Sequence, residues 1–226
     1  MAYAPACAKV NNRVEGMHYR LYNDMDIEFM GIDTGSGSRT YTRTLFFVCC
    51  KAINDLFPQA EVRIDISVSK GYFVDMRIGR QVTAADTERV RRRMEEIIAA
   101  RIPIKRHMVP TEEAVRLFAA KGDTSKVKLL NGLGSLYTVY YQIEDFVDYF
   151  YGALMTNTAD IHLFGLVPFN GGMLLQVPSP ENPAVLCDMP DQRKMFEIFQ
   201  EHHGPEDRGR PERGGRQGLC HRHHQH

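Results

Sequence analysis

The segment TRTLFFVCCKAINDLFP, residues 42–58, decides how the rest of the chain can fold. Its apolar residues recur at intervals of three and four positions, which predicts an amphipathic helix with one side against a core. Pro58 ends this helix because proline has no amide hydrogen to donate and its ring clashes with the preceding turn. The residues expected to face the core are Leu45, Phe46, Cys49, Ile53, Leu56 and Phe57.

A β-hairpin is predicted directly after this helix. Apolar and polar residues alternate on both sides of a turn at residues 69–71, as they do in strands with one buried face. The apolar residues of the two strands are Val62, Ile64, Ile66 and Val68, followed by Tyr72, Val74, Met76 and Ile78. The sequence therefore places a helix on a two-stranded ribbon.

The segments after the hairpin predict more helices and strands. Thr83 and Asp86 form a capping-box pattern that opens a helix to about Arg101, and residues 102–109 are expected to be a strand. Thr111 is expected to cap a further helix that Gly122 closes. Region 126–178 is predicted to be rich in strands, with turns at 131–134 and 170–172 and strands at 137–141, 160–167 and 173–177. Helices on an antiparallel sheet, the α+β class, follow from this order.

Four segments are expected along the chain. Residues 1–38 contain strand patterns at 8–16 and 26–30 but too few apolar residues for a core of their own, and the Gly-Ser stretch 34–38 is expected to be a flexible boundary. Residues 39–177 form the main domain. Residues 178–203 are expected to be a proline-rich linker and an amphipathic helix from 191 to 202, and residues 204–226 to be disordered because the run 204–218 has no apolar residue.

Composition indicates a soluble globular protein. Lys+Arg and Asp+Glu are 28 each, so no overall charge attracts the chain to nucleic acid or to an acidic membrane. No apolar run approaches the roughly 20 residues that span a bilayer and no signal peptide is recognisable, which leads us to expect a cytoplasmic protein without a membrane partner. The five cysteines are expected to be reduced and mostly buried.

Common catalytic motifs are absent. The chain has no Gly-Lys dipeptide and therefore no P-loop, and it has no GxSxG or HExxH motif. His18, His107 and His162 are scattered, and each is expected to be a surface or satisfied core histidine. Four arginines between Arg89 and Arg93 alternate with glutamates at pairing distance, which indicates a solvated face rather than a nucleic-acid contact.

Several motifs, taken in order, resemble the editing domain of threonyl-tRNA synthetases. They are LFP at 56–58, GYFVD at 71–75, MEEII at 94–98, EEAVRLF at 112–118 and DFVD at 145–148. Residues 8–33 resemble the second half of the TGS domain that precedes it in those enzymes. The resemblance covers about 8–177 and implies a partial β-grasp piece followed by an α+β domain with helices on an antiparallel sheet.

The positions that would hold the family's catalytic zinc have changed. The resemblance places the metal ligands at Arg43 and Phe47 of the helix and at Phe150 and Leu154 of a later loop. A catalytic zinc needs about three nitrogen, sulfur or oxygen ligands, so no metal site is expected here. Lys126 and Asp148 are what remains of the family's pocket; an ordinary ion pair or a capped loop is the simpler interpretation of both.

A second resemblance, over about 5–203, is to the N-terminal region of uridine-kinase-like nucleoside kinases of the Bacteroides group. It rests on segments such as AKVNNRVEG at 8–16, VSKGY at 68–72 and KMFEIF at 194–199. It implies a non-catalytic binding or regulatory region whose partner is a downstream kinase domain. No cofactor is expected in this chain, and ATP and Mg²⁺ would belong to that missing domain.

The ligand expected on this hypothesis is a small molecule or an RNA end. The candidate ligand-binding residues are Arg43, Tyr72, Lys126 and Asp148, since Arg43 could pair an anionic group at the former metal position; the simpler interpretation of Arg43 is a surface residue on the first helical turn. Three alternatives stay open. They are a free-standing or trans-editing deacylase of mischarged tRNA with a metal-free mechanism, an RNA-binding accessory module, and a structural module that oligomerises through residues 191–203.

Overall fold

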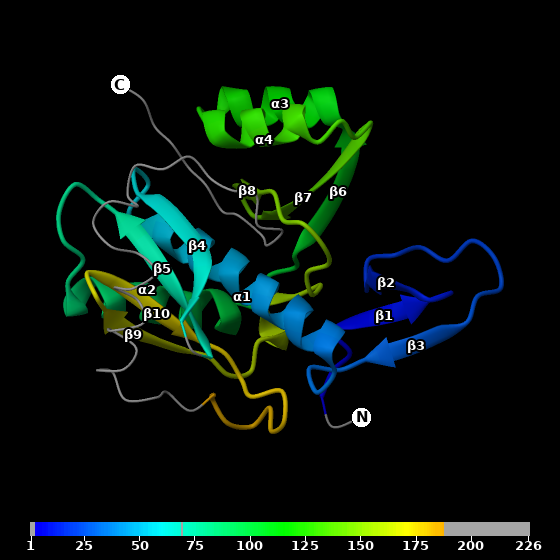
Figure 1. Ribbon diagram of the computed structural model, residues 1–226, viewed down its shortest axis with the longest axis horizontal. Coiled ribbons are helices and arrows are strands. Elements are labelled where there is room, and N and C mark those ends of the chain that lie inside the picture. The colour runs from blue at the N-terminus through cyan, green and yellow to red at the C-terminus, as the bar shows by residue number, and fades with distance from the viewer. Residues whose placement is uncertain (1–2, 69, 188–226) are drawn as a thin grey trace.

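The computed structural model describes residues 3–68 and 70–187, without the side chains of Asp65 and Ile66. It has three antiparallel sheets arranged around one long helix, α1 (Gly35–Leu56), which crosses the middle of the molecule (Figure 1). The predicted α+β class is therefore confirmed. The predicted amphipathic helix 191–202, the rest of the linker beyond Cys187 and the tail 204–226 lie outside the described residues.

The N-terminal sheet has the strand order β2-β1-β3, with β1 at Cys7–Val10, β2 at Arg13–Gly16 and β3 at Ile27–Met30. Asn11 and Asn12 join β1 to β2 with φ values of 44° and 67°. Both angles are positive, as the two central residues of a type I′ turn require, and asparagine tolerates this region better than most residues. The strand, turn and strand predicted from the sequence are confirmed.

Helix α1 begins seven residues before the segment that predicts it, and the expectation of a flexible Gly-Ser boundary at 34–38 was wrong. Thr34 caps the helix and accepts a 3.1 Å hydrogen bond from the amide of Gly37. A Cβ atom on Gly37 would lie 1.9 Å from the carbonyl oxygen of Gly31, so only glycine fits there. Small residues let a helical turn pack closely against its neighbours. The same Gly-Ser composition is also typical of a flexible linker, so composition alone does not distinguish the two.

Helices α1 and α2 (Ala84–Ala99) pack on one face of a four-stranded sheet with the order β4-β5-β10-β9. The hairpin predicted at 62–78 is β4 (Glu61–Val68) and β5 (Gly71–Arg77), and the turn predicted at 170–172 joins β9 (Gly165–Phe169) to β10 (Gly172–Gln176). Asp160, expected in a strand, belongs to the short helix η1 (Thr158–Asp160), which Asn157 caps. The capping box of Thr83 and Asp86 is confirmed.

The third sheet, β6-β7-β8, carries two helices on one face (Figure 1). Its strands are β6 (Lys105–Pro110), β7 (Tyr137–Ile143) and β8 (Phe146–Asp148), and the helices are α3 (Thr111–Ala120) and α4 (Thr124–Gly132). Thr111 does not cap α3: its hydroxyl donates to the carbonyl of Ser135. The sequence did not predict α4, and the turn expected at 131–134 instead includes the end of that helix.

The buried core supports the predicted helix face. Leu45, Cys49 and Ile53 of that face are fully buried. Phe47, Val48 and Ala52 are fully buried as well, so α1 is covered on more sides than the spacing predicted. Cys7, Cys49, Cys50 and Cys187 are buried and form no disulfide, as expected, while Cys220 lies outside the described residues. Across residues 3–68 and 70–187, the structure contains no helix long and apolar enough to cross a membrane.

Candidate functional site

The four positions that would hold a metal lie close together. Phe47 of α1 is buried, and its ring meets that of Phe150 edge to face, with centroids 5.6 Å apart. Leu154, in the same segment after β8, is also completely buried. Three of the four positions are therefore core packing, and only Arg43 offers a polar group.

Arg43 is a half-buried cation fixed against the loop after β8. Its Nη1 donates a 3.0 Å hydrogen bond to the carbonyl of Ala153. Its guanidinium packs on Gly152, where an added Cβ would lie 2.9 Å from Cζ. Burial, and then the charge of Arg39, lower the pKa of Arg43. The interpretation of Arg43 as a surface residue on the first helical turn was wrong, because α1 begins at Gly35.

Two further arginines lie on neighbouring elements, and one of them, Arg39, is exposed and donates a 3.0 Å hydrogen bond from its Nη2 to the hydroxyl of Ser36. Arg39 lies one turn before Arg43 on α1, and Arg106 lies opposite Tyr141 in the pairing of β6 with β7. The Tyr141 hydroxyl donates a 2.9 Å hydrogen bond to the carbonyl of Gly152. Burial raises the pKa of Tyr141, and the positive charges of Arg106 and Arg43 oppose this increase. We call Arg39, Arg43 and Arg106 the arginine cluster.

Histidine 18 reaches the same tyrosine from the N-terminal sheet. Its ring lies 6.1 Å from that of Tyr141, measured between centroids, and its Nε2 is 2.7 Å from the carbonyl oxygen of Ile104. Because a carbonyl can only accept, Nε2 carries a hydrogen, and in the neutral ring Nδ1 is then the acceptor nitrogen. Nδ1 is buried and has no hydrogen-bond partner in the described structure.

Lys126 and Asp148 form a buried ion pair. Lys126 also lies 3.2 Å from Oδ2 of Asp123 and 5.5 Å from the centre of the Phe118 ring, while Asp148 accepts a 2.7 Å hydrogen bond from the amide of Tyr149. Asp123 caps α4 through the amide of Lys126. The structure thus contains both the ion pair and the capping interaction that the simpler interpretation expected. A ligand-binding role for Lys126 or Asp148 stays a prediction.

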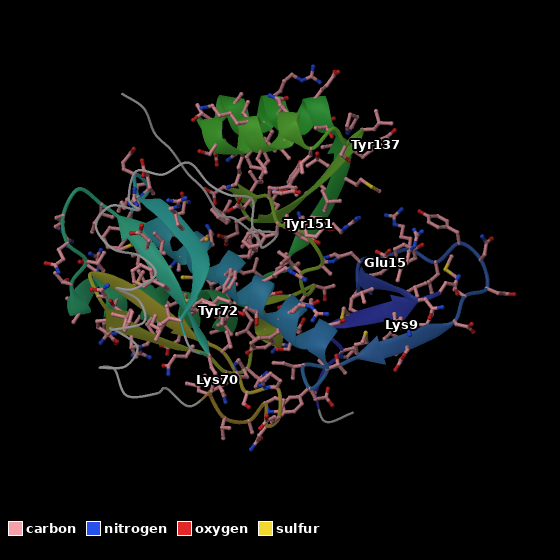
Figure 2. All side chains as sticks on the ribbon, in the orientation of Figure 1. Lys9, Glu15, Lys70, Tyr72, Tyr137 and Tyr151 are labelled. Carbon is pink, nitrogen blue, oxygen red and sulfur yellow. The ribbon has the colours of Figure 1, made fainter. Side chains whose placement is uncertain are left out.

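Tyr72 belongs to another interface. It lies on β5, and its ring meets that of Phe46 edge to face, with centroids 4.8 Å apart. Burial raises its pKa. Tyr72 therefore joins α1 to the four-stranded sheet, whereas Arg43 faces the segment around Gly152. Figure 2 shows Tyr72 beside the four-stranded sheet and Tyr151 nearer to β7.

The described residues include no group of three His, Cys, Asp or Glu side chains that could hold a metal ion. Two histidines have other partners. His107 hydrogen-bonds to the side chain of Gln142 at 2.8 Å, and Nε2 of His162 donates a 2.9 Å hydrogen bond to the carbonyl of Pro183. The residues present do not fit a zinc ion at the positions that the resemblance indicates.

Sequence reasoning missed most of the group around Gly152. Arg39 stands four residues before Arg43, a spacing that places both on one face of a helix, and this signal was available. Arg106, Tyr141 and His18 come from distant segments, so their meeting with Arg43 depends on the pairing of β6 with β7 and on the docking of the N-terminal sheet.

The chain is similar to threonine–tRNA ligases from several bacteria. That of Acetivibrio thermocellus is 26% identical over 172 residues, 76% of this chain and 27% of the relative. That of Pelobacter propionicus is 28% identical over 171 residues, and threonine–tRNA ligase 2 of Bacillus subtilis is 28% identical over 168. This similarity supports homology to a region of threonyl-tRNA synthetases, and the chain spans about a quarter of the length of these relatives. No protein-family model matches the chain.

Proposed function

We propose that this chain binds the aminoacylated 3′ end of a tRNA and hydrolyses the ester without a metal ion. The observation that carries the proposal is the juxtaposition of the α1 positions Arg43 and Phe47 with the segment containing Phe150 and Leu154. The similarity to threonine–tRNA ligases over three quarters of the chain supports a related substrate. The loss of metal-ligand residue types at all four positions supports a changed mechanism.

His18 is the general base of this proposal. Hydrolysis adds water to the carbonyl carbon, breaks the bond from that carbon to the ribose oxygen and returns a proton to the ribose oxygen. Nε2 of His18 is oriented by the carbonyl of Ile104, which leaves Nδ1 to accept the proton of the attacking water. Nδ1 has no hydrogen-bond partner in the described structure, and this unused acceptor supports such a role.

The test is the release of amino acids from several mischarged tRNAs, with and without a chelator. We expect release above the rate in buffer, no effect of the chelator, and a drop in kcat of about 10²-fold in His18→Gln, because general-base catalysis contributes roughly 10²–10⁴-fold. Arg43→Gln should mainly raise KM. Arg116→Gln, an exposed residue on α3, is the control.

Two results would contradict the proposal. Inhibition by the chelator would mean that a metal takes part, and release no faster than in buffer would exclude hydrolysis. If the chain binds tRNA but does not release the amino acid, an RNA-binding accessory module is the remaining function. The apolar residues Phe47, Phe150 and Leu154 at three of the four former metal positions favour that function.

The nucleoside-kinase context is a separate hypothesis. The relatives named above are ligases, and their similarity gives no support to a uridine-kinase partner or to ATP and Mg²⁺ in a following domain. Binding of a kinase domain, and oligomerisation through 191–203, stay predictions. Light scattering with and without residues 191–203 tests the second.

A further inference from the structure

The four-stranded sheet has two faces, and only one of them carries helices of the described structure. Val74 and Met76 of β5 belong to the main hydrophobic cluster, with α1 and α2. Successive residues of a strand point to opposite faces, so Phe73 lies on the other face. Leu174 of β10 lies opposite Phe73, and Val167 of β9 lies opposite Leu174. We call this side, away from α1 and α2, the second face of the sheet.

The second face has a hydrophobic cluster of its own. Its residues are Val68, Phe73, Phe169 and Leu174, with Val167 packed against them. Leu174 is completely buried, and the exposed fractions of the other three are at most 9%. No helix within residues 3–68 and 70–187 contributes a side chain to this cluster. Side chains that stand side by side on one sheet leave their tips open to water, so such burial requires a second layer above the strands.

The size of the cluster suits a single helix. Asp75 and Arg77 follow Phe73 on the same face of β5 and form an ion pair, with 3.0 Å between Oδ2 and Nη2, so the face becomes polar there. Four strands that are about 4.8 Å apart are together ~14 Å wide. A helix with its side chains has a diameter of about 10–12 Å. One helix is therefore enough to cover the apolar part.

The described chain ends beside the second face. The amide of Cys187 donates a 3.0 Å hydrogen bond to the carbonyl of Val177, which directly follows β10. Gly165 pairs with Gln176, two residues after Leu174, and so lies at the end of the second face. Cδ1 of Leu186 lies 3.1 Å from the position of a Cβ atom added to Gly165. The segment after residue 187 therefore starts at one end of this face.

That segment has the sequence of a matching helix. Residues 191–202 read DQRKMFEIFQEH, and at about 100° per residue the apolar side chains fall on one side, with Glu197 opposite them. Such a helix is ~18 Å long, close to the ~17 Å of a five-residue strand. The three residues 188–190 reach roughly 10 Å, enough to bring the start of the helix over the sheet. The apolar residues are Met195, Phe196, Ile198 and Phe199.

We propose that residues 191–202 form a helix that packs on the second face of its own chain, against the cluster around Phe73 and Leu174. The sheet then carries helices on both faces. The proposal is independent of tRNA hydrolysis. It gives residues 191–203 a partner within the same chain, in place of a second copy.

The experiment replaces Phe199 of the full chain by the photoreactive benzoylphenylalanine and maps the crosslinks by mass spectrometry. We expect crosslinks to residues 71–77 or 165–176, in a product with the mass of one chain. The same replacement of Glu197, on the opposite side of the helix, is the matched control and should give no crosslink to these segments.

Hydrogen exchange of the unlabelled chain gives a second readout. The amides of residues 192–202 should be protected in the wild type and in Glu197→Gln, and Phe199→Asp should lose this protection because a carboxylate is costly to bury against an apolar sheet. Light scattering should show more self-association in Phe199→Asp, since the cluster is then uncovered.

Three results would overturn the proposal. Crosslinks from position 199 that appear only in products of twice the mass would mean that the helix binds a second copy. Crosslinks from positions 197 and 199 in equal yield, or none to the second face, would mean that the helix does not pack there. Loss of oligomers in Phe199→Asp would show that this side of the helix joins two copies.

Discussion

At the scale of single residues, Gly152 is the position on which the site depends. Its φ is +104°, a conformation that side chains rarely adopt, and an added Cβ would meet the Arg43 guanidinium. A substitution there has two separate costs, backbone strain and displacement of Arg43. Gly79 allows these to be distinguished, because its φ is +76° and an added Cβ would meet no atom within 4 Å.

Gly152→Ala should therefore lower the free energy of unfolding more than Gly79→Ala does. The strain alone costs about 1–2 kcal/mol in either variant, and the collision adds to it only at Gly152. Urea denaturation measures both variants, and the KM for mischarged tRNA should rise only in Gly152→Ala. Equal losses of stability with an unchanged KM would show that Arg43 can move away at no cost.

At the scale of elements, the start of α2 illustrates how a local pattern becomes a pH-dependent contact. Asp86 accepts hydrogen bonds from the amide and the hydroxyl of Thr83 at 3.0 and 2.8 Å, and it pairs with Arg80. The hydrogen bonds from Arg80 are the main reason that the pKa of Asp86 is held well below its usual range; burial opposes them and Thr83 adds to them.

Because the pKa of Asp86 is depressed in the folded state, its contribution to stability is present above the unfolded value of about 3.9 and is lost as the pH falls through the folded value. The free energy of unfolding should therefore decrease on acidification below about pH 4, and less steeply in Asp86→Asn. Urea titrations across this range test the difference. Asp24→Asn, at an exposed position, is the control. The prediction is contradicted if the free energy of unfolding of Asp86→Asn changes with pH as steeply as that of the wild type.

At the scale of the whole molecule, the N-terminal sheet is joined to the main core by the residues that flank it. Ala6 and Ile32, at its two ends, are 1% and 3% exposed and belong to the same hydrophobic cluster as α1. Gly16 lies against Ala153, and His18 hydrogen-bonds to Ile104. The sequence indicated that this piece needs support, and these contacts provide it.

The chain should consequently unfold in one transition. It has no tryptophan, so tyrosine fluorescence and far-ultraviolet circular dichroism are the two probes, and their urea curves should coincide. Deleting residues 1–33 should lower the midpoint of thermal unfolding by exposing the core beside α1. Independent folding of a 1–33 peptide, or a deletion variant as stable as the full chain, would argue for two domains with a boundary near residue 38.

The sequence by itself determined the features that depend on neighbouring residues. The three- and four-residue spacing of 42–58 predicted the buried face of α1, Asn11 and Asn12 predicted the turn between β1 and β2, and Thr83 with Asp86 predicted the start of α2. Each of these is set by backbone dihedral preferences and short-range hydrogen bonds, which a few consecutive residues contain in full.

Only the tertiary structure decided the rest. Helix α1 extends back to Gly35 because Gly37 fits against the carbonyl of Gly31, and the stretch GSGS does not reveal that neighbour. The arginine cluster likewise depends on strand register: Arg106 comes to Arg43 only because β6 pairs with β7 and Tyr141 reaches Gly152. The charge of each arginine can be read from the sequence, but the groups that surround it are a property of three-dimensional packing.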